Sequence, residues 1–148
     1  MSKWAGLAGM RVGYGLMPRS LVPYLGAVVP AFHNVGLAAS VAAVASLDDR
    51  EYLQGIVHRI SADRDVLIDQ LRELPGVEPF PSETNFVLMR LPVADGPAIV
   101  RRMAELGVLV RSFSHPRLKD TLRVSIGTPD EHERFLDALE TALREASA

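Results

Sequence analysis

The stretch Ser2-Lys3-Trp4-Ala5-Gly6-Leu7-Ala8-Gly9-Met10-Arg11-Val12-Gly13-Tyr14 decides how the rest of this 148-residue chain is interpreted. It places a primary amine (Lys3), a hydroxyl (Ser2) and a guanidinium (Arg11) around a glycine-rich turn. A lysine amine can bond covalently to an aldehyde. A hydroxyl and the planar fork of an arginine suit a phosphate group. The stretch therefore predicts a site for a molecule that carries both an aldehyde and a phosphate.

Pyridoxal phosphate (PLP) is such a molecule. The pattern SKxxGLAGxRxGY of residues 2–14 resembles the cofactor-lysine segment of class I/II (fold type I) aminotransferases, and most of all their histidinol-phosphate branch. The resemblance implies that Lys3 is the catalytic lysine, which binds the cofactor aldehyde and then acts as general base at the substrate Cα. It also implies that Ser2 and Arg11 bind the cofactor phosphate.

The composition narrows the alternatives. Hydrophobic residues make up 48% of the chain, which is enough for a packed core. The net charge of −2, with no basic block, argues against a nucleic-acid partner. The absence of cysteine excludes disulfides, thiolate nucleophiles and Cys-zinc sites. No histidine has a second ligand at metal spacing, so we expect no metal. No signal peptide is visible, which makes a cytoplasmic location the default expectation.

Residues 20–47 carry no charged side chain. The run is long enough to span a membrane, but Pro23, Pro30 and Gly36 interrupt it, and each break frees backbone groups that lipid cannot satisfy. We therefore expect no membrane span. The alanine-rich part, residues 35–47, instead predicts a helix that is buried on all sides, or one that associates with a partner if its cover is missing.

Hydrophobic periodicity and turn residues predict the remaining elements. Asp48-Asp49 is expected to cap the long helix that follows. The predicted helices are residues 18–25, 35–47, 50–74, 96–105 and the segment from Pro129 onward. The predicted strands are residues 10–16, 85–91, 108–110 and 122–126, and residues 76–80 are predicted to form a short strand or a turn.

The resemblance covers the whole chain but maps it onto the C-terminal part of a longer α/β enzyme of fold type I. It implies that residues 1–48 are a remnant of the large cofactor-binding domain and that residues 49–148 form a small α+β domain, with 49–74 as the connecting helix. In the family, the acid at the pyridine nitrogen and the aromatic against the ring lie upstream of the lysine. We therefore expect the 148-residue chain alone to be inactive, and the full-length enzyme to be a homodimer.

Three further residues are candidates for substrate binding. Arg123 lies in Leu122-Arg123-Val124-Ser125-Ile126-Gly127-Thr128, which matches an LRxxxGT segment that supplies the family's arginine for the anionic group of the substrate. Without that context, Arg123 reads as a strand residue with its head group in solvent. Asn85 and Arg111 are possible substrate contacts, although Asn85 equally fits a turn residue that bonds its own backbone.

The expected reaction is PLP-dependent transfer of an amino group between a 2-oxo acid and an amino acid or amino-alcohol phosphate of the histidinol-phosphate type, as in amino-acid biosynthesis. Two alternatives stay open: a PLP-dependent phospho-amino-acid decarboxylase of the same fold, and a truncated, non-catalytic α+β domain. Departures from the family pattern leave the substrate open. Residues 32–36 read Phe-His-Asn-Val-Gly where PFNVN is usual, and Ser40 replaces a common glutamine.

Overall fold

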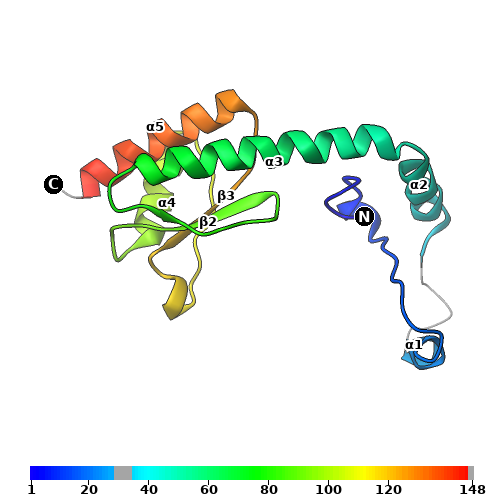
Figure 1. Cartoon of the computed structure of the whole chain (residues 1–148). Coiled ribbons are helices and arrows are strands. Elements are labelled where there is room, and N and C mark those ends of the chain that lie inside the picture. The colour runs from blue at the N-terminus through cyan, green and yellow to red at the C-terminus, as the bar shows by residue number, and fades with distance from the viewer. Residues whose placement is uncertain (29–34, 147–148) are drawn as a thin grey trace. The chain divides into compact units, whose positions relative to one another are not determined.

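The computed structural model describes residues 1–28 and 35–146 and divides into two compact units, Met1–Val57 and His58–Ala148 (Figure 1). The first unit contains the 3-10 helix η1 (Ala8–Met10), α1 (Val22–Val28), α2 (Leu37–Asp48) and the start of α3 (Arg50–Glu73). The predicted helices at 35–47 and 50–74 are confirmed to within a few residues. The motif positions His33 and Asn34 lie outside the described residues.

Two predictions for the first unit are wrong. Residues 10–16 form no strand: η1 covers Ala8–Met10, and Arg11 follows in the left-handed region with φ 51°. A strand requires a paired neighbour, and this unit offers none among its described residues. Helix α1 begins at Val22 rather than at Pro18, because Pro18 opens a separate turn in which the Leu21 amide donates to its carbonyl at 2.9 Å.

Asp49 joins α2 to α3 through its main chain. Its amide donates to the Ala45 carbonyl at 3.1 Å, which closes α2, and its carbonyl accepts from the Leu53 amide at 3.2 Å, which opens α3. Asp48 is the last residue of α2 and does not cap α3, which corrects that part of the prediction. The backbone of one residue therefore serves both helix ends.

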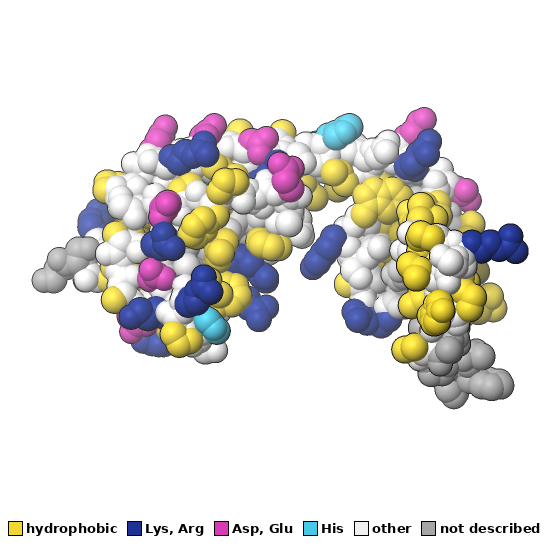
Figure 2. All heavy atoms as spheres, turned by 60° about the horizontal axis from the view of Figure 1, so that its bottom comes forward, with side chains coloured by type: hydrophobic (Ala, Val, Ile, Leu, Met, Phe, Trp, Pro, Cys, Tyr) yellow, Lys and Arg dark blue, Asp and Glu magenta, His cyan; other side chains and the backbone are white. Residues whose placement is uncertain are grey.

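Helix α2 presents apolar side chains to solvent. Leu37, Val41 and Val44 lie at helical spacing and are 81%, 61% and 59% exposed. Figure 2 shows hydrophobic side chains gathered on the unit that contains α1 and α2. The prediction that α2 is buried on all sides is thus wrong for this structure, whereas the prediction of an uncovered apolar surface is confirmed. No helix in the described part of the chain is long and apolar enough to cross a membrane.

The second unit is built on an antiparallel sheet with strand order β1-β2-β3. The strands are β1 (Glu78–Pro79), β2 (Phe86–Arg90) and β3 (Thr121–Ser125); α4 (Gly96–Glu105), η2 (Pro116–Leu118) and α5 (Pro129–Ala146) complete the unit with the rest of α3. The predicted helix at 96–105, the helix from Pro129 and the strands at 85–91 and 122–126 are confirmed. The predicted strand at 76–80 is reduced to two residues.

The predicted strand at 108–110 is wrong, and the end of α4 explains why. The Gly107 amide donates to the Ala104 carbonyl at 3.0 Å, and the Val108 amide donates to the Met103 carbonyl at 2.9 Å. These two bonds, with Gly107 at φ 84°, form a Schellman motif that ties the segment to the helix. The chain reaches the sheet only at Arg111, which makes an isolated antiparallel bridge with Arg123.

One face of the sheet supplies the core. Alternate residues of β2 and β3 are buried, while α3, α4 and α5 cover that face (Figure 1). The fully buried members of this core with large side chains are Leu67, Leu71, Met89, Ile99, Met103, Leu122 and Leu139. The residues between them on the strands, Arg123 among them, point to the opposite face.

We expect Leu67→Ala to lower the free energy of unfolding of the second unit by about 2–5 kcal/mol, because it leaves a cavity between α3 and the sheet. Leu109→Ala is the matched control, since Leu109 is 86% exposed whereas Leu67 is fully buried. The control should change the free energy by less than about 0.5 kcal/mol. Chemical denaturation followed by circular dichroism measures both. Equal effects of the two substitutions would contradict the assigned core.

Candidate functional site

The face of the sheet opposite the core carries arginines, each stacked on a phenylalanine. Residues that oppose one another in an antiparallel pair share a face. Leu88 opposes Arg123, and Arg123 opposes Arg111, so these side chains lie on one side. The three stacked pairs are Arg90 over Phe80 at 5.2 Å, Arg111 over Phe113 at 5.4 Å and Arg123 over Phe86 at 4.8 Å to the ring centroid. A ring beneath a guanidinium stabilises its charge and leaves its edge free to donate.

Arg111 and Arg123 lie together at the β3 edge of the sheet. The Arg111 amide donates to the Arg123 carbonyl at 3.1 Å, and the Arg123 amide donates to the Arg111 carbonyl at 2.8 Å. Two like charges directly opposite each other are unfavourable in a sheet. Among the described residues, neither arginine has a carboxylate within ion-pair distance. The Nε of Arg123 is in addition buried without a hydrogen-bond acceptor. The charges of these two guanidiniums are therefore not balanced by a carboxylate among the described residues.

Arg90, on the neighbouring strand β2, is an arginine whose charge is neutralised by carboxylates of the protein. Its guanidinium contacts the Glu78 carboxylate at 2.8 Å and the Asp120 carboxylate at 3.4 Å. Arg90 thus links the strands, and its charge is balanced by the protein itself. Arg90 is thus paired within the protein, whereas Arg111 and Arg123 have no carboxylate partner among the described residues.

A cavity of about 610 Å³ opens beside the arginine pair. Its walls come from residues 107–111, from β3 and the turn after it, and from the first two turns of α5. Both Arg111 and Arg123 line it. Its size is in the range of small-molecule sites. The cavity with its unpaired guanidiniums suits a ligand with a carboxylate or phosphate group.

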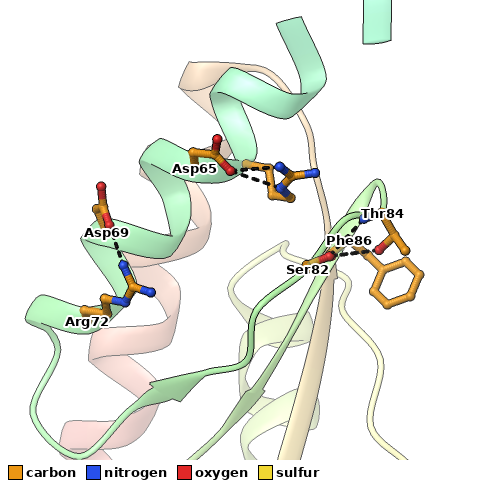
Figure 3. A network of polar contacts seen from close by, with 7 residues as sticks. Asp65, Asp69, Arg72, Ser82, Thr84 and Phe86 are labelled. Atoms are coloured by element: carbon orange, nitrogen blue, oxygen red, sulfur yellow. Dashed lines mark hydrogen bonds and ion pairs between the residues drawn. The ribbon is translucent and has the colours of Figure 1, made fainter. Parts of the chain in front are cut away.

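The loop before β2 holds the ring under Arg123. The Ser82 hydroxyl donates to the Phe86 carbonyl at 2.6 Å, and the Thr84 hydroxyl donates to the same carbonyl at 3.1 Å (Figure 3). The Thr84 amide in turn donates to the Ser82 hydroxyl at 3.1 Å. These bonds close a tight turn, as short hydroxyl side chains often do. Phe86 therefore starts its strand from a fixed position.

Asn85 contributes its main chain to the same region. Its carbonyl accepts from the Ile126 amide at 3.0 Å, which extends the β2–β3 pairing beyond the strands. The turn bonds expected of the Asn85 side chain are supplied instead by Ser82 and Thr84. Asn85 thus lies beside the turn that follows Arg123. Its role as a substrate contact stays a prediction.

The turn from β3 into α5 is fixed by two side chains of the helix. The Glu131 carboxylate accepts from the Thr128 amide at 2.7 Å and from the Thr128 hydroxyl at 3.2 Å. This is a capping box, in which residue N3 of the helix binds back to the N-cap. The ring Nε2 of His132 accepts from the Gly127 amide at 3.1 Å. A Cβ at Gly127 would lie too close to the Glu131 side chain, so a larger residue there would displace the carboxylate that caps the helix.

Both helix side chains have shifted pKa values. The Thr128 amide, and then its hydroxyl, lower the pKa of Glu131, because they stabilise the charged carboxylate. Burial lowers the pKa of His132, because it disfavours the charged ring, while the carboxylates of Asp63 and Glu131 act in the opposite direction. Neutral His132 and charged Glu131 are the forms that accept hydrogen bonds from this turn.

Ser2, Lys3 and Arg11 lie in the other unit. A turn closed by the Ala5 amide on the Met1 carbonyl, at 3.1 Å, carries Ser2 and the exposed Lys3. Arg11 follows η1, and its amide donates to the Ala8 carbonyl at 3.4 Å. The structure therefore brings Arg111 and Arg123 together, with Asn85 near their strand. The three cofactor candidates belong to a separate unit.

Comparison with known proteins places the chain in a family. The family model for aminotransferase class I and II matches residues 1–139. The histidinol-phosphate aminotransferase of Roseiflexus castenholzii is 43% identical over 141 residues, which are 93% of this chain and 38% of that protein. The chain belongs to the class I and II aminotransferases. It spans less than half the length of this relative.

Solved aminotransferase-fold structures agree with this membership. Histidinol-phosphate aminotransferase from Sinorhizobium meliloti, in complex with pyridoxal-5'-phosphate, matches with a TM-score of 0.82 and 28% identity over 98% of this chain and 40% of that chain. L-threonine-O-3-phosphate decarboxylase from Porphyromonas gingivalis matches with a TM-score of 0.82 and 27% identity over 97% and 45%. The predicted family and the α/β fold of type I are confirmed.

The sequence interpretation of this aminotransferase chain missed three residues of the site. Glu131 had a visible signal, because Thr128-Pro129-Asp130-Glu131 fits the capping-box pattern with proline at the first helical position. No sequence signal marked Phe86 or His132. The contact of Phe86 with Arg123 depends on the pairing of two strands, and the contact of His132 with Gly127 depends on how α5 packs.

We expect the pKa of the Glu131 carboxyl to lie below that of an ordinary glutamate, because the Thr128 amide and hydroxyl stabilise its charged form. Its contribution to the free energy of unfolding is then complete above the ordinary glutamate pKa and is lost as the pH falls through the lower folded-state pKa. Carboxyl-detected NMR titration measures this value. Thr128→Val removes one donor and should raise the pKa of Glu131 part of the way back, whereas Glu133→Gln, on the same helix, should leave it unchanged. An ordinary Glu131 titration would contradict the capping box.

Proposed function

We propose that this chain is part of a PLP-dependent aminotransferase that moves an amino group between a 2-oxo acid and an amino acid or amino-alcohol phosphate of the histidinol-phosphate type. The observation that carries the proposal is the pair Arg111 and Arg123, which face one cavity without a protein anion. Membership of the aminotransferase family supplies the class of reaction. The relatives that are named histidinol-phosphate aminotransferases point to a substrate with an anionic group.

In this proposal Arg123 and Arg111 bind the carboxylate or phosphate of the substrate. The ring of Phe86, whose centroid is 4.8 Å from the Arg123 guanidinium carbon, stabilises the guanidinium charge from one side and leaves its N–H edge free to donate. A planar fork binds such an anion through two parallel hydrogen bonds and so fixes its orientation. The reacting amino group is then presented in one direction.

The N-terminal residues fit PLP by their chemistry. Lys3 is an exposed primary amine, as a group that must bond to an aldehyde needs to be. The Ser2 hydroxyl and the Arg11 guanidinium are suitable phosphate donors. When bound, the cofactor withdraws electrons from the substrate Cα. Lys3 would hold the cofactor and move the proton at that carbon.

The domain assignment extends this proposal. Residues 1–48 would belong to the cofactor-binding domain and residues 49–148 to the small domain that holds the substrate anion. The exposed apolar stripe of Leu37, Val41 and Val44 supports a homodimer of the whole enzyme, or cover from another part of it. The 148-residue chain alone would be inactive, since the pyridine acid and the stacking aromatic that the family uses have no assigned counterpart in it.

A second candidate is a PLP-dependent phospho-amino-acid decarboxylase. The likeness to L-threonine-O-3-phosphate decarboxylase favours it, because that structure has the same TM-score as the aminotransferase structure. Its substrate also carries an anion that Arg111 and Arg123 could bind. Release of CO2, as opposed to transfer of the amino group to a 2-oxo acid, distinguishes the two reactions in the whole enzyme.

The chain contains two lysines, Lys3 and Lys119, and both are exposed, so each serves as a control for the other. We expect PLP followed by borohydride reduction to label Lys3 in preference to Lys119, because Lys3 lies in the glycine-rich motif with the proposed phosphate donors Ser2 and Arg11, whereas Lys119 is followed directly by the carboxylate of Asp120. Peptide mass mapping measures the ratio. Lys3→Arg should abolish the main label and Lys119→Arg should preserve it. Equal labelling of the two lysines would contradict the assignment of Lys3 as the cofactor lysine.

We expect Arg123→Leu to weaken sulfate binding by the chain tenfold or more, because charge-assisted hydrogen bonds to the anion are lost. Arg111→Leu should have an effect in the same direction. Arg90→Leu is the matched control: it removes the same charge from the same face, but from a guanidinium already held by Glu78 and Asp120. NMR titration with sulfate measures all three variants. If Arg90→Leu weakened sulfate binding as much as Arg123→Leu, the effect would reflect the net charge of the surface and not a specific anion site.

A further inference from the structure

Three successive amides after β3 are each held by a different group. Ile126 donates to the Asn85 carbonyl at 3.0 Å, Gly127 to the His132 ring at 3.1 Å, and Thr128 to the Glu131 carboxylate at 2.7 Å. The first bond belongs to the sheet and the third to the helix cap. The middle bond joins the two, so the path from Arg123 to α5 depends on it.

A backbone amide can only donate, so the ring Nε2 of His132 must carry a free lone pair. Protonated histidine has donors on both nitrogens and cannot accept this bond. In that state a donor would face a donor in a turn where the ring is only 5% exposed. An unsatisfied buried amide is costly, so the turn would move.

We propose that His132 is a positioning residue for the anion site: in its neutral form it holds the Gly127 amide and thereby fixes the turn that ends the Arg123 strand. Protonation of the ring releases the turn and weakens anion binding. The inference rests on the proposed role of Arg123 and adds to it a residue that does not touch the anion.

The turn and the anion site share one cavity, which supports this coupling. Arg123, Gly127, Glu131 and His132 all line its wall. Gly127 also packs closely against the Glu131 side chain, so the turn contacts α5 through Glu131 and His132 together. When the hydrogen bond from Gly127 to His132 is lost, the turn therefore moves, and the end of β3 moves with it.

The charges around the ring affect its titration in opposite directions. Asp63 on α3 and Glu131 on α5 favour the protonated ring, whereas burial favours the neutral ring and lowers the pKa of His132. Arg123 and Arg134 line the same cavity and carry positive charge. Protonation by itself would add one more positive charge beside the site and strengthen sulfate binding. A fall in affinity on protonation is therefore diagnostic of the lost hydrogen bond.

The test uses the 148-residue chain with sulfate as the probe, because sulfate keeps its charge between pH 5 and 8. NMR follows the His132 ring, the Gly127 amide and sulfate affinity across this range and below it until the ring titrates. We expect the Gly127 amide signal to move with the same midpoint as the ring. Sulfate affinity should fall about fivefold through that midpoint, as expected for one hydrogen bond.

Two substitutions separate positioning from charge. His132→Gln keeps an acceptor near the position of Nε2 but does not titrate, so its sulfate affinity should stay at the high level at every pH. His132→Leu removes the acceptor and should bind weakly at every pH. His58→Gln, an exposed position on α3, is the control and should behave as the unmodified chain. Circular dichroism verifies that each variant is folded, and the His132→Gln result stands alone if His132→Leu does not fold.

The outcomes distinguish the inference from the function on which it rests. Sulfate affinity that stays level or rises while the His132 ring titrates would overturn the positioning role alone. The same holds if His132→Gln shows the pH dependence of the unmodified chain. Absence of sulfate binding by the unmodified chain at pH 8 would overturn the anion role of Arg123 and, with it, the inference.

Discussion

Two main-chain hydrogen bonds between Arg111 and Arg123 bring two positive charges to neighbouring positions on one face of a small sheet. Among the residues that the structure describes, no carboxylate balances either charge, although two carboxylates balance Arg90 on the adjacent strand. Folding thus holds together two groups that repel each other. The cost of about 0.2–1 kcal/mol for like charges opposite one another is small beside the burial that holds the sheet. The anionic ligand that we propose for this site would offset this cost.

The burial on the other face makes this possible. Alternation along β2 and β3 sends Val87, Met89, Leu122 and Val124 into the core and leaves Arg123 and its neighbours outside. The helices α3, α4 and α5 pack on the apolar face alone. The open face is therefore free to carry arginines, and the phenylalanine rings beneath them provide a surface on which a guanidinium is held without an acidic partner.

The end of α4 and the start of α5 set the limits of the site. The Schellman motif at Gly107 keeps residues 107–110 with the helix, so that a cavity remains between this segment and β3. On the other side, Glu131 and His132 hold the turn through groups that titrate. Helix ends always leave backbone groups without helical partners, and here those groups shape the wall of the cavity.

The sequence by itself determined the family, the order of the long helices and the identity of Arg123 as a candidate. The signals were local: the glycine-rich lysine turn, the 3.6-residue periodicity of α3 and α5, the stop at Gly107 and the start at Pro129. Residues 10–16 and 108–110 had strand-like composition, yet neither became a strand. A strand exists only when a partner lies beside it, and composition does not report the partner.

Only the tertiary structure decided that Arg111 pairs with Arg123, that Phe86 lies under one of them and that His132 holds Gly127. The first two contacts join residues on different strands or segments. The third joins neighbours in sequence, but it depends on the direction in which α5 leaves the turn. Such contacts follow from packing the helices on one face of the sheet, because that packing alone sets which side chains meet on the other face and along its edge.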